Sequence, residues 1–251
     1  MPDPAYLTTP QGRNIAFHLT PGASPTIVFL GGFRSDMDGT KALYLEAWAK
    51  AQGRAFLRLD YSGHGASSGD FLDGCIGDWT TDAYHAIVQQ VPGNIVLVGS
   101  SMGGWIALLL ARRLADRIVG MIGIAAAPDF TEDDMRCNFT PKQQAELADK
   151  GQIALPSDYS DEPYIITRRL IEDGRDQLVL RTPLVLSWPT RFLQGTADTD
   201  VDISVALRLL NHASGPDIRL TLVKGADHRF STPAALDLIV SSVADVLDHM
   251  L

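Results

Sequence analysis

The sequence predicts a doubly wound α/β domain, in which a mostly parallel sheet carries helices on both faces. Apolar runs with strand character alternate with helical patterns along most of the chain, as in sheets built from βαβ units. Within this alternation, residues 94–111 run from a buried strand straight into a glycine-flanked serine and then a helix. The alternation breaks between residues 128 and 189, which predicts a helical cap inserted after the sixth strand.

The part of the chain before the cap supplies most of the predicted sheet. Asn14–Leu19 alternates like a half-exposed strand, whereas Thr26–Leu30 is a continuous apolar run that is typical of a buried one. A helix is expected from about Leu43 until shortly before Gly53. Further strands are expected at residues 55–61, 94–98 and 118–125, and further helices at about 79–91 and directly after the serine.

Two or more helices, with no strand between them, are expected in the cap, at about residues 128–189. Thr140-Pro-Lys-Gln143 is a capping box with proline at the first helical position, and Gly151 is a suitable stop. The second helix is expected from Pro163 to Asp173, ended by Gly174. The segment is alternatively a long crossover connection without a cap function.

The sheet pattern resumes after the cap and completes a single domain over residues 1–251. Strands are expected at 190–193 and 218–223, with a helix at about 203–210 between them. Thr232-Pro233 opens the last helix. A chain of this length can bury a full core without a second domain.

Charge and cysteine content restrict the partners and the location. The net charge of −9 and the isoelectric point near 5.0 argue against a nucleic acid or an anionic membrane surface as partner. Cys75 and Cys137 lie far apart and lack metal-site spacing, so neither disulfides nor zinc are expected. The first residues lack the pattern of a signal peptide, and no apolar run reaches a membrane span. A cytoplasmic location is expected, and the oligomeric state is left open.

The glycine-flanked serine has the pattern of a nucleophile elbow. Gly99-Ser-Ser101-Met-Gly103 fits G-x-S-x-G in one register only, which makes Ser101 the candidate nucleophile. Small residues are needed there because the serine occupies a tight, strained turn between strand and helix. The helix that follows directs its N-terminal N–H groups toward any oxyanion beside Ser101. The alternative is a glycine-rich turn with a solvent-facing serine.

The order of the partners in this architecture is serine, then acid, then histidine. Asp198 follows the strand at 190–193, and His228 follows the strand at 218–223, so these two residues are the candidate acid and base. Asp200 and Asp202 compete with Asp198 for the acid role.

The oxyanion donors are expected to be backbone N–H groups. The residue after the nucleophile, Met102, supplies one, and Phe33 in the loop after the third strand supplies the other. Asp60–Gly65 contains a second aspartate and histidine, but a glycine-rich structural turn is the favoured interpretation. No metal constellation or cofactor fingerprint is present, so no metal and no cofactor are expected.

Several stretches together resemble the α/β-hydrolase group that contains mycophenolic acid acyl-glucuronide esterase, also described as palmitoyl-protein thioesterase. They are Gly31–Ala42, Asp60–Gly65, Gly99–Trp105, Pro156–Tyr159 and Asp227–Arg229. The resemblance implies an α/β-hydrolase fold with the triad at Ser101, Asp198 and His228. The chain departs from the group at Gln194, where histidine is common, and at Asp202, where proline is usual.

The triad predicts acyl transfer through an acyl-enzyme on Ser101, and the resemblance implies a small-molecule ester or thioester as substrate. The alternatives are a receptor-like protein that binds ligands without catalysis, or another triad enzyme such as a C–C hydrolase or a peptidase. The cap leaves the sheet at the edge where Ser101 must lie, so its apolar face is expected to meet the acyl group. Tyr159, Tyr164 and Ile165 are the candidate substrate contacts there.

Overall fold

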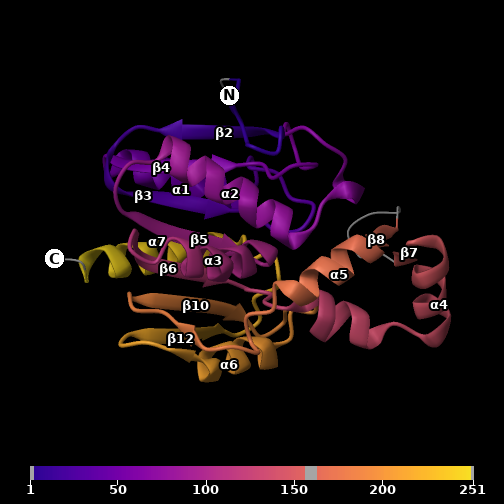
Figure 1. The fold of residues 1–251 in the computed structure, drawn as a ribbon. Coiled ribbons are helices and arrows are strands. Elements are labelled where there is room, and N and C mark those ends of the chain that lie inside the picture. Colours follow the sequence, from indigo (N-terminus) through magenta and orange to yellow (C-terminus); the bar gives the residue numbers. More distant parts are fainter. Residues whose placement is uncertain (1–2, 156–162, 250–251) are drawn as a thin grey trace.

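The computed structural model describes residues 3–155 and 163–249 (Figure 1). Eight strands form the main sheet, in the order β1-β2-β4-β3-β5-β6-β10-β12. β1 (Ala5–Thr8) and β2 (Asn14–Thr20) pair antiparallel, and β2 is also antiparallel to β4. The remaining strands pair in parallel: β4 (Arg54–Leu59), β3 (Ala23–Leu30), β5 (Ile95–Ser100), β6 (Ile118–Ile124), β10 (Thr190–Gly195) and β12 (Ile218–Val223).

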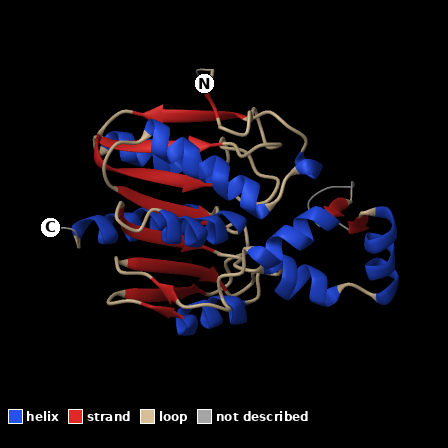
Figure 2. Ribbon diagram, viewed as in Figure 1, coloured by secondary structure: helices blue, strands red, loops and turns tan. Residues whose placement is uncertain are grey.

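Helices cover both faces of this sheet, which confirms the predicted doubly wound arrangement (Figure 2). One face carries α2 (Ile76–Gln90), α3 (Met102–Arg113) and α6 (Ile203–His212), and the other carries α1 (Thr40–Ala51) and α7 (Pro233–Asp248). α3 is buried from Met102 to Ala111, because it crosses the centre of the sheet with apolar residues on every side. This burial fixes the start of α3, where Ser101 lies.

The segment between β6 and β10 lies beyond the carboxyl ends of the parallel strands (Figure 1). It begins with a short π-helix, Thr131–Met135, and a 3₁₀ helix, Arg136–Asn138. It then contains α4 (Pro141–Lys150), β7 (Gln152–Leu155), β8 (Tyr164–Thr167) and α5 (Arg168–Asp176). α4 begins with the predicted capping box and ends at Gly151 in the left-handed conformation. Two-residue strands β9 (Leu184–Val185) and β11 (Ala213–Ser214) pair near its end.

The predicted second helix of this segment is wrong at both ends. Residues 164–167 form β8, which pairs antiparallel with β7, so the segment is not purely helical. The β-branched residues of Tyr164–Thr167 favour a strand, and the Thr167 hydroxyl accepts from the Leu170 N–H to cap α5. α5 continues past Gly174 to Asp176, and a Cβ at Gly174 would lie 2.1 Å from the Thr131 hydroxyl oxygen. That glycine is therefore a packing requirement rather than a stop signal.

β1 was not expected from the sequence, because it is short, mostly exposed and at the edge of the sheet. With β1 included, the strand before the inserted segment is the sixth. In the described ranges, no helix has the length and hydrophobicity needed to cross a bilayer.

Candidate active site

Ser101 occupies a strained turn between β5 and α3. Its φ of 54° and ψ of −120° lie in a region that L residues rarely adopt. Close packing accounts for the two flanking glycines. A Cβ at Gly99 would lie 2.3 Å from the Gly103 carbonyl oxygen, and one at Gly103 would lie 2.1 Å from the Leu30 carbonyl oxygen. The G-x-S-x-G spacing is thus a steric condition for this turn.

The structure brings Ser101, His228 and Asp198 together in one chain of hydrogen bonds. The loop after β12 places His228 Nε2 3.1 Å from Ser101 Oγ. The opposite ring nitrogen, Nδ1, lies 2.9 Å from Asp198 Oδ2, in the loop after β10. The Asp198 side chain is 0% exposed and that of His228 is 18% exposed, so the chain of hydrogen bonds runs from the interior to an accessible serine.

Asp198 is held as a carboxylate by donors on both oxygens. The backbone N–H groups of Asp200 and Val201 donate to Oδ1 over 2.9 Å each, and Gln194 Nε2 donates to Oδ2 over 2.9 Å. Burial alone would raise the pKa of Asp198. The hydrogen bonds from His228, Val201 and Asp200 outweigh burial and lower this pKa below its ordinary value.

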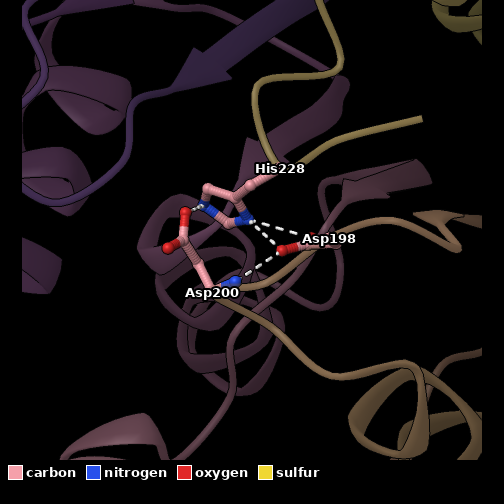
Figure 3. A group of neighbouring side chains, drawn as sticks. All are labelled: Asp198, Asp200 and His228. Carbon is pink, nitrogen blue, oxygen red and sulfur yellow. Dashed lines mark hydrogen bonds and ion pairs between the residues drawn. The ribbon is translucent and has the colours of Figure 1, made fainter. Parts of the chain in front are cut away.

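The two competing carboxylates occupy different positions. Asp200 Oδ2 lies 4.0 Å from His228 Nε2, on the side of the ring opposite Asp198 (Figure 3). Asp202 caps α6 by accepting from the Ser204 N–H. Only Asp198, among these three, meets the Nδ1 side of His228.

The same group contains atoms that are close enough to share a metal ion. One ligand atom each from Asp198, Asp200 and His228 lies within 4.8 Å of the others. Both Asp198 oxygens already accept several hydrogen bonds, and His228 Nδ1 is one of their donors. A metal ion would have to displace those contacts, and the expectation of no metal remains a prediction.

Phe33 and Met102 both border the cavity that contains Ser101. Met102 is the first residue of α3, where backbone N–H groups have no partner within the helix. The loop with Phe33 passes close to the serine, since a Cβ at Gly32 would lie 3.4 Å from Ser101 Cβ. Neither N–H donates a hydrogen bond to a residue in the described ranges. Both remain available to an oxyanion.

The cavity beside Ser101 has a volume of about 640 Å³. Its apolar wall comes from the segment between β6 and β10, and consists of Phe130, Met135, Phe139, Leu155 and Tyr164. Of the contacts predicted from the sequence, Tyr164 lines the cavity, and Tyr159 lies outside the described residues. Ile165 is absent from the described lining because side chains alternate along β8, which puts it on the face opposite Tyr164.

The first part of this apolar wall was not identified from the sequence. Phe130, Met135 and Phe139 lie in or directly beside a short π-helix and a short 3₁₀ helix, and both are too short to show an α-helical or strand period in the sequence. The sequence did offer one signal for them, which is their position: they follow β6, the strand that pairs with β5 beside Ser101.

Asp60 and His64 make structural hydrogen bonds to nearby backbone groups. Asp60 accepts from the backbone N–H groups of Met37 and Ala66, and His64 Nδ1 contacts the Ser62 carbonyl oxygen. Burial lowers the pKa of His64 to about 4, which keeps its ring neutral. The favoured interpretation of this stretch as a structural turn agrees with these contacts.

Comparisons with known proteins agree with this geometry. A family model described as the alpha/beta hydrolase family matches residues 27–247. The human protein named palmitoyl-protein thioesterase ABHD10, mitochondrial, is 33% identical over 248 residues, which are 98% of this chain and 80% of that protein. The match confirms the resemblance seen in the sequence. Because that protein is named as mitochondrial, the cytoplasmic location remains a prediction.

Two solved structures share the fold over nearly the whole chain. A putative hydrolase from Agrobacterium vitis S4 superimposes with a TM-score of 0.94 at 42% identity, covering 97% of this chain and 98% of the other. Mouse alpha/beta hydrolase domain-containing protein 10 superimposes with a TM-score of 0.92 at 30% identity, covering 100% of both chains.

Proposed function

The chain belongs to the alpha/beta hydrolase family, and we propose that it hydrolyses carboxylic esters or thioesters through an acyl-enzyme on Ser101. The observation that carries this proposal is the hydrogen-bonded series from Asp198 through His228 to Ser101. A general base within 3.1 Å of the hydroxyl meets the geometric requirement for proton abstraction.

In the acylation step, His228 Nε2 accepts the Ser101 hydroxyl proton while Oγ bonds to the carbonyl carbon of the substrate. The carbonyl oxygen becomes an oxyanion, which the backbone N–H groups of Phe33 and Met102 stabilise. When the bond to the leaving group breaks, His228 gives its proton to the departing oxygen or sulfur. Water then attacks the acyl-enzyme by the same route, which releases the acid and restores the serine.

Asp198 acts on His228 rather than on the substrate. Its carboxylate accepts a hydrogen bond from the Nδ1–H group, so that Nε2 presents a lone pair to Ser101. The same negative charge stabilises the imidazolium that forms during each proton transfer. The donors to Asp198 keep it ionised and oriented for both tasks.

The apolar cavity wall supports an acyl group as the part of the substrate that it holds. Phe130, Met135 and Leu155 offer carbon surface beside the nucleophile, and Tyr164 adds an aromatic ring. In this proposal, Tyr164 and its neighbours set the preference for acyl chain length rather than the chemistry at Ser101. Esters and thioesters are favoured as substrates because the human relative is named as a thioesterase.

A kinetic panel tests this function. Esters, thioesters, acyl glucuronides and amides with matched acyl chains should be assayed with wild type, Ser101→Ala and Ser100→Ala. We expect turnover of esters or thioesters that Ser101→Ala loses and Ser100→Ala keeps. Binding without turnover would favour a receptor-like protein, and a clear preference for amides would favour a peptidase. Either result would overturn the proposal.

A further inference from the structure

Arg34 presents a guanidinium to the cavity, and no described residue serves as its hydrogen-bond acceptor. It directly follows Phe33 and lines the same cavity as Ser101 and His228. Arginines elsewhere in the chain, such as Arg58 and Arg191, donate to carboxylates. Arg34, in contrast, makes no hydrogen bond or ion pair with any residue that the structure describes.

Two aromatic rings hold the Arg34 guanidinium in place. Its central carbon lies 5.1 Å from the ring centre of Phe71 and 5.3 Å from that of Tyr164. Such contacts restrict the side chain while they leave the N–H groups at the edge of the guanidinium plane available. Arg34 also has a φ of 57°, a strained value for a residue other than glycine. The two rings therefore limit the positions of this exposed side chain, and its N–H groups stay open to a ligand.

Two further cations line the same cavity, Arg229 and Lys41. The Lys41 ammonium group donates to the Arg229 carbonyl oxygen over 2.6 Å, which fixes the charge in the cavity wall. Three cationic residues at one cavity stand out in a chain with a net charge of −9. The carboxylates of Asp134 and Asp200 also line the cavity, and that of Asp200 lies near His228 Nε2.

The cavity thus offers two kinds of surface to a substrate. Phe130, Met135 and Phe139 suit an acyl chain, which leaves the three cationic residues for the other part of the molecule. We propose that Arg34 binds a carboxylate or phosphate group carried by the leaving group of the substrate. The proposal rests on the proposed ester or thioester hydrolysis. Guanidinium groups bind both anions through paired N–H donors.

Matched substrates test this subsite. The butyryl esters of glycolate and glycolamide differ only in a carboxylate or a carboxamide on the leaving group. We expect a higher kcat/KM for the glycolate ester, and a loss of about tenfold or more of this preference in Arg34→Gln at low salt. Arg34→Lys should keep part of the preference. Arg54→Gln serves as the matched control. Arg54 donates to the Ser24 carbonyl oxygen and is the first residue of β4, so it lies at the amino end of that strand, away from the edge that carries Ser101.

Two more substrate pairs identify the anion and its position. The butyryl ester of 2-hydroxyethyl phosphate separates phosphate from carboxylate, and retention of the Arg34 effect with either anion supports the proposal. A third pair places the carboxylate on the acyl group, as in 4-nitrophenyl succinate against its succinamate. An Arg34 effect confined to this pair would overturn the assignment to the leaving group. An equal loss for charged and neutral esters in Arg34→Gln would assign Arg34 a structural role instead.

A binding measurement separates failure of this inference from failure of the proposed function. N-butyrylglycine carries the same carboxylate on an amide in place of the ester, so its affinity can be measured without turnover. Calorimetry should detect weaker binding of N-butyrylglycine to Arg34→Gln than to wild type, with N-butyrylglycinamide unaffected. If wild type hydrolysed none of the esters, the proposed function would fail, and equal binding of N-butyrylglycine to both proteins would then refute the anion subsite.

Discussion

Replacement of Asp198 by asparagine is expected to inactivate the protein through the tautomer of His228. Four donors now face the two oxygens of Asp198. Two backbone N–H groups meet Oδ1, Gln194 Nε2 meets Oδ2, and His228 Nδ1 lies 2.9 Å from Oδ2 and 3.1 Å from Oδ1. Asparagine has one acceptor oxygen. If that oxygen faces the backbone donors, its NH₂ group faces both Gln194 and His228, where another donor is unfavourable.

His228 relieves this conflict by moving its proton from Nδ1 to Nε2. Nε2 then donates toward Ser101 Oγ and cannot accept the serine proton. We expect kcat to fall about 10⁴-fold, the magnitude typical of a triad whose histidine has the wrong tautomer. The donor left facing Gln194 should reduce the free energy of unfolding by about 1–3 kcal/mol.

Asp200→Asn is the matched control, because it also replaces a carboxylate beside the His228 ring by an amide, on the side opposite Asp198. Steady-state kinetics on a neutral ester measures kcat, and thermal unfolding measures stability for each variant. Asp200→Asn should change kcat by less than about tenfold, since its contact at 4.0 Å is too long for a hydrogen bond. A severe loss in Asp200→Asn together with an active Asp198→Asn would refute the assignment of the acid.

Three further predictions concern the support of the site. Gly103→Ala would put a Cβ 2.1 Å from the Leu30 carbonyl oxygen, so denaturant unfolding should show a loss of at least about 3 kcal/mol. Gln194→Leu removes one donor from Asp198, so kcat should fall about tenfold with little change in KM, and Gln194→His should restore part of it. Burial lowers the pKa of His64 to about 4, below its unfolded value of 6.5, so the folded state resists protonation in this range. Stability should therefore fall by about 3 kcal/mol between pH 6.5 and 4, and this part of the loss should be absent in His64→Phe.

The elements that the sequence predicted best are those in which local pattern and burial agree. The elbow around Ser101 combines a continuous apolar strand, two sterically required glycines and an apolar helix within one short stretch. The order of the acid and histidine loops along the chain then limits the candidates for the partners. These signals are local, so they require no knowledge of the tertiary structure.

The wrong predictions concern positions where tertiary contacts, rather than the local sequence pattern, determine the secondary structure. Gly174 has the position of a helix stop, but α5 continues past it to Asp176. A side chain at this position would clash with Thr131, which explains why the residue is glycine. Tyr164–Thr167 pairs with a strand across the inserted segment, so its β character depends on a partner that periodicity does not reveal.

The choice among the three acidic residues also required coordinates. The three candidates, Asp198, Asp200 and Asp202, follow one another at intervals of two. The sequence favours Asp198 only because it forms a D-x-x-V frame with Val201. In the structure, burial and four donors distinguish Asp198 from its neighbours. Arg34 was not predicted either, because its role depends on aromatic rings from two distant segments.

The most direct test of the central claim is covalent labelling of the nucleophile. A fluorophosphonate probe should modify wild type at Ser101, as located by mass spectrometry of the labelled peptide. Ser101→Ala should lose both labelling and hydrolysis, whereas Ser100→Ala, one residue earlier in the same turn, should keep both. Labelling that persists in Ser101→Ala, or that maps to another residue, would contradict the account.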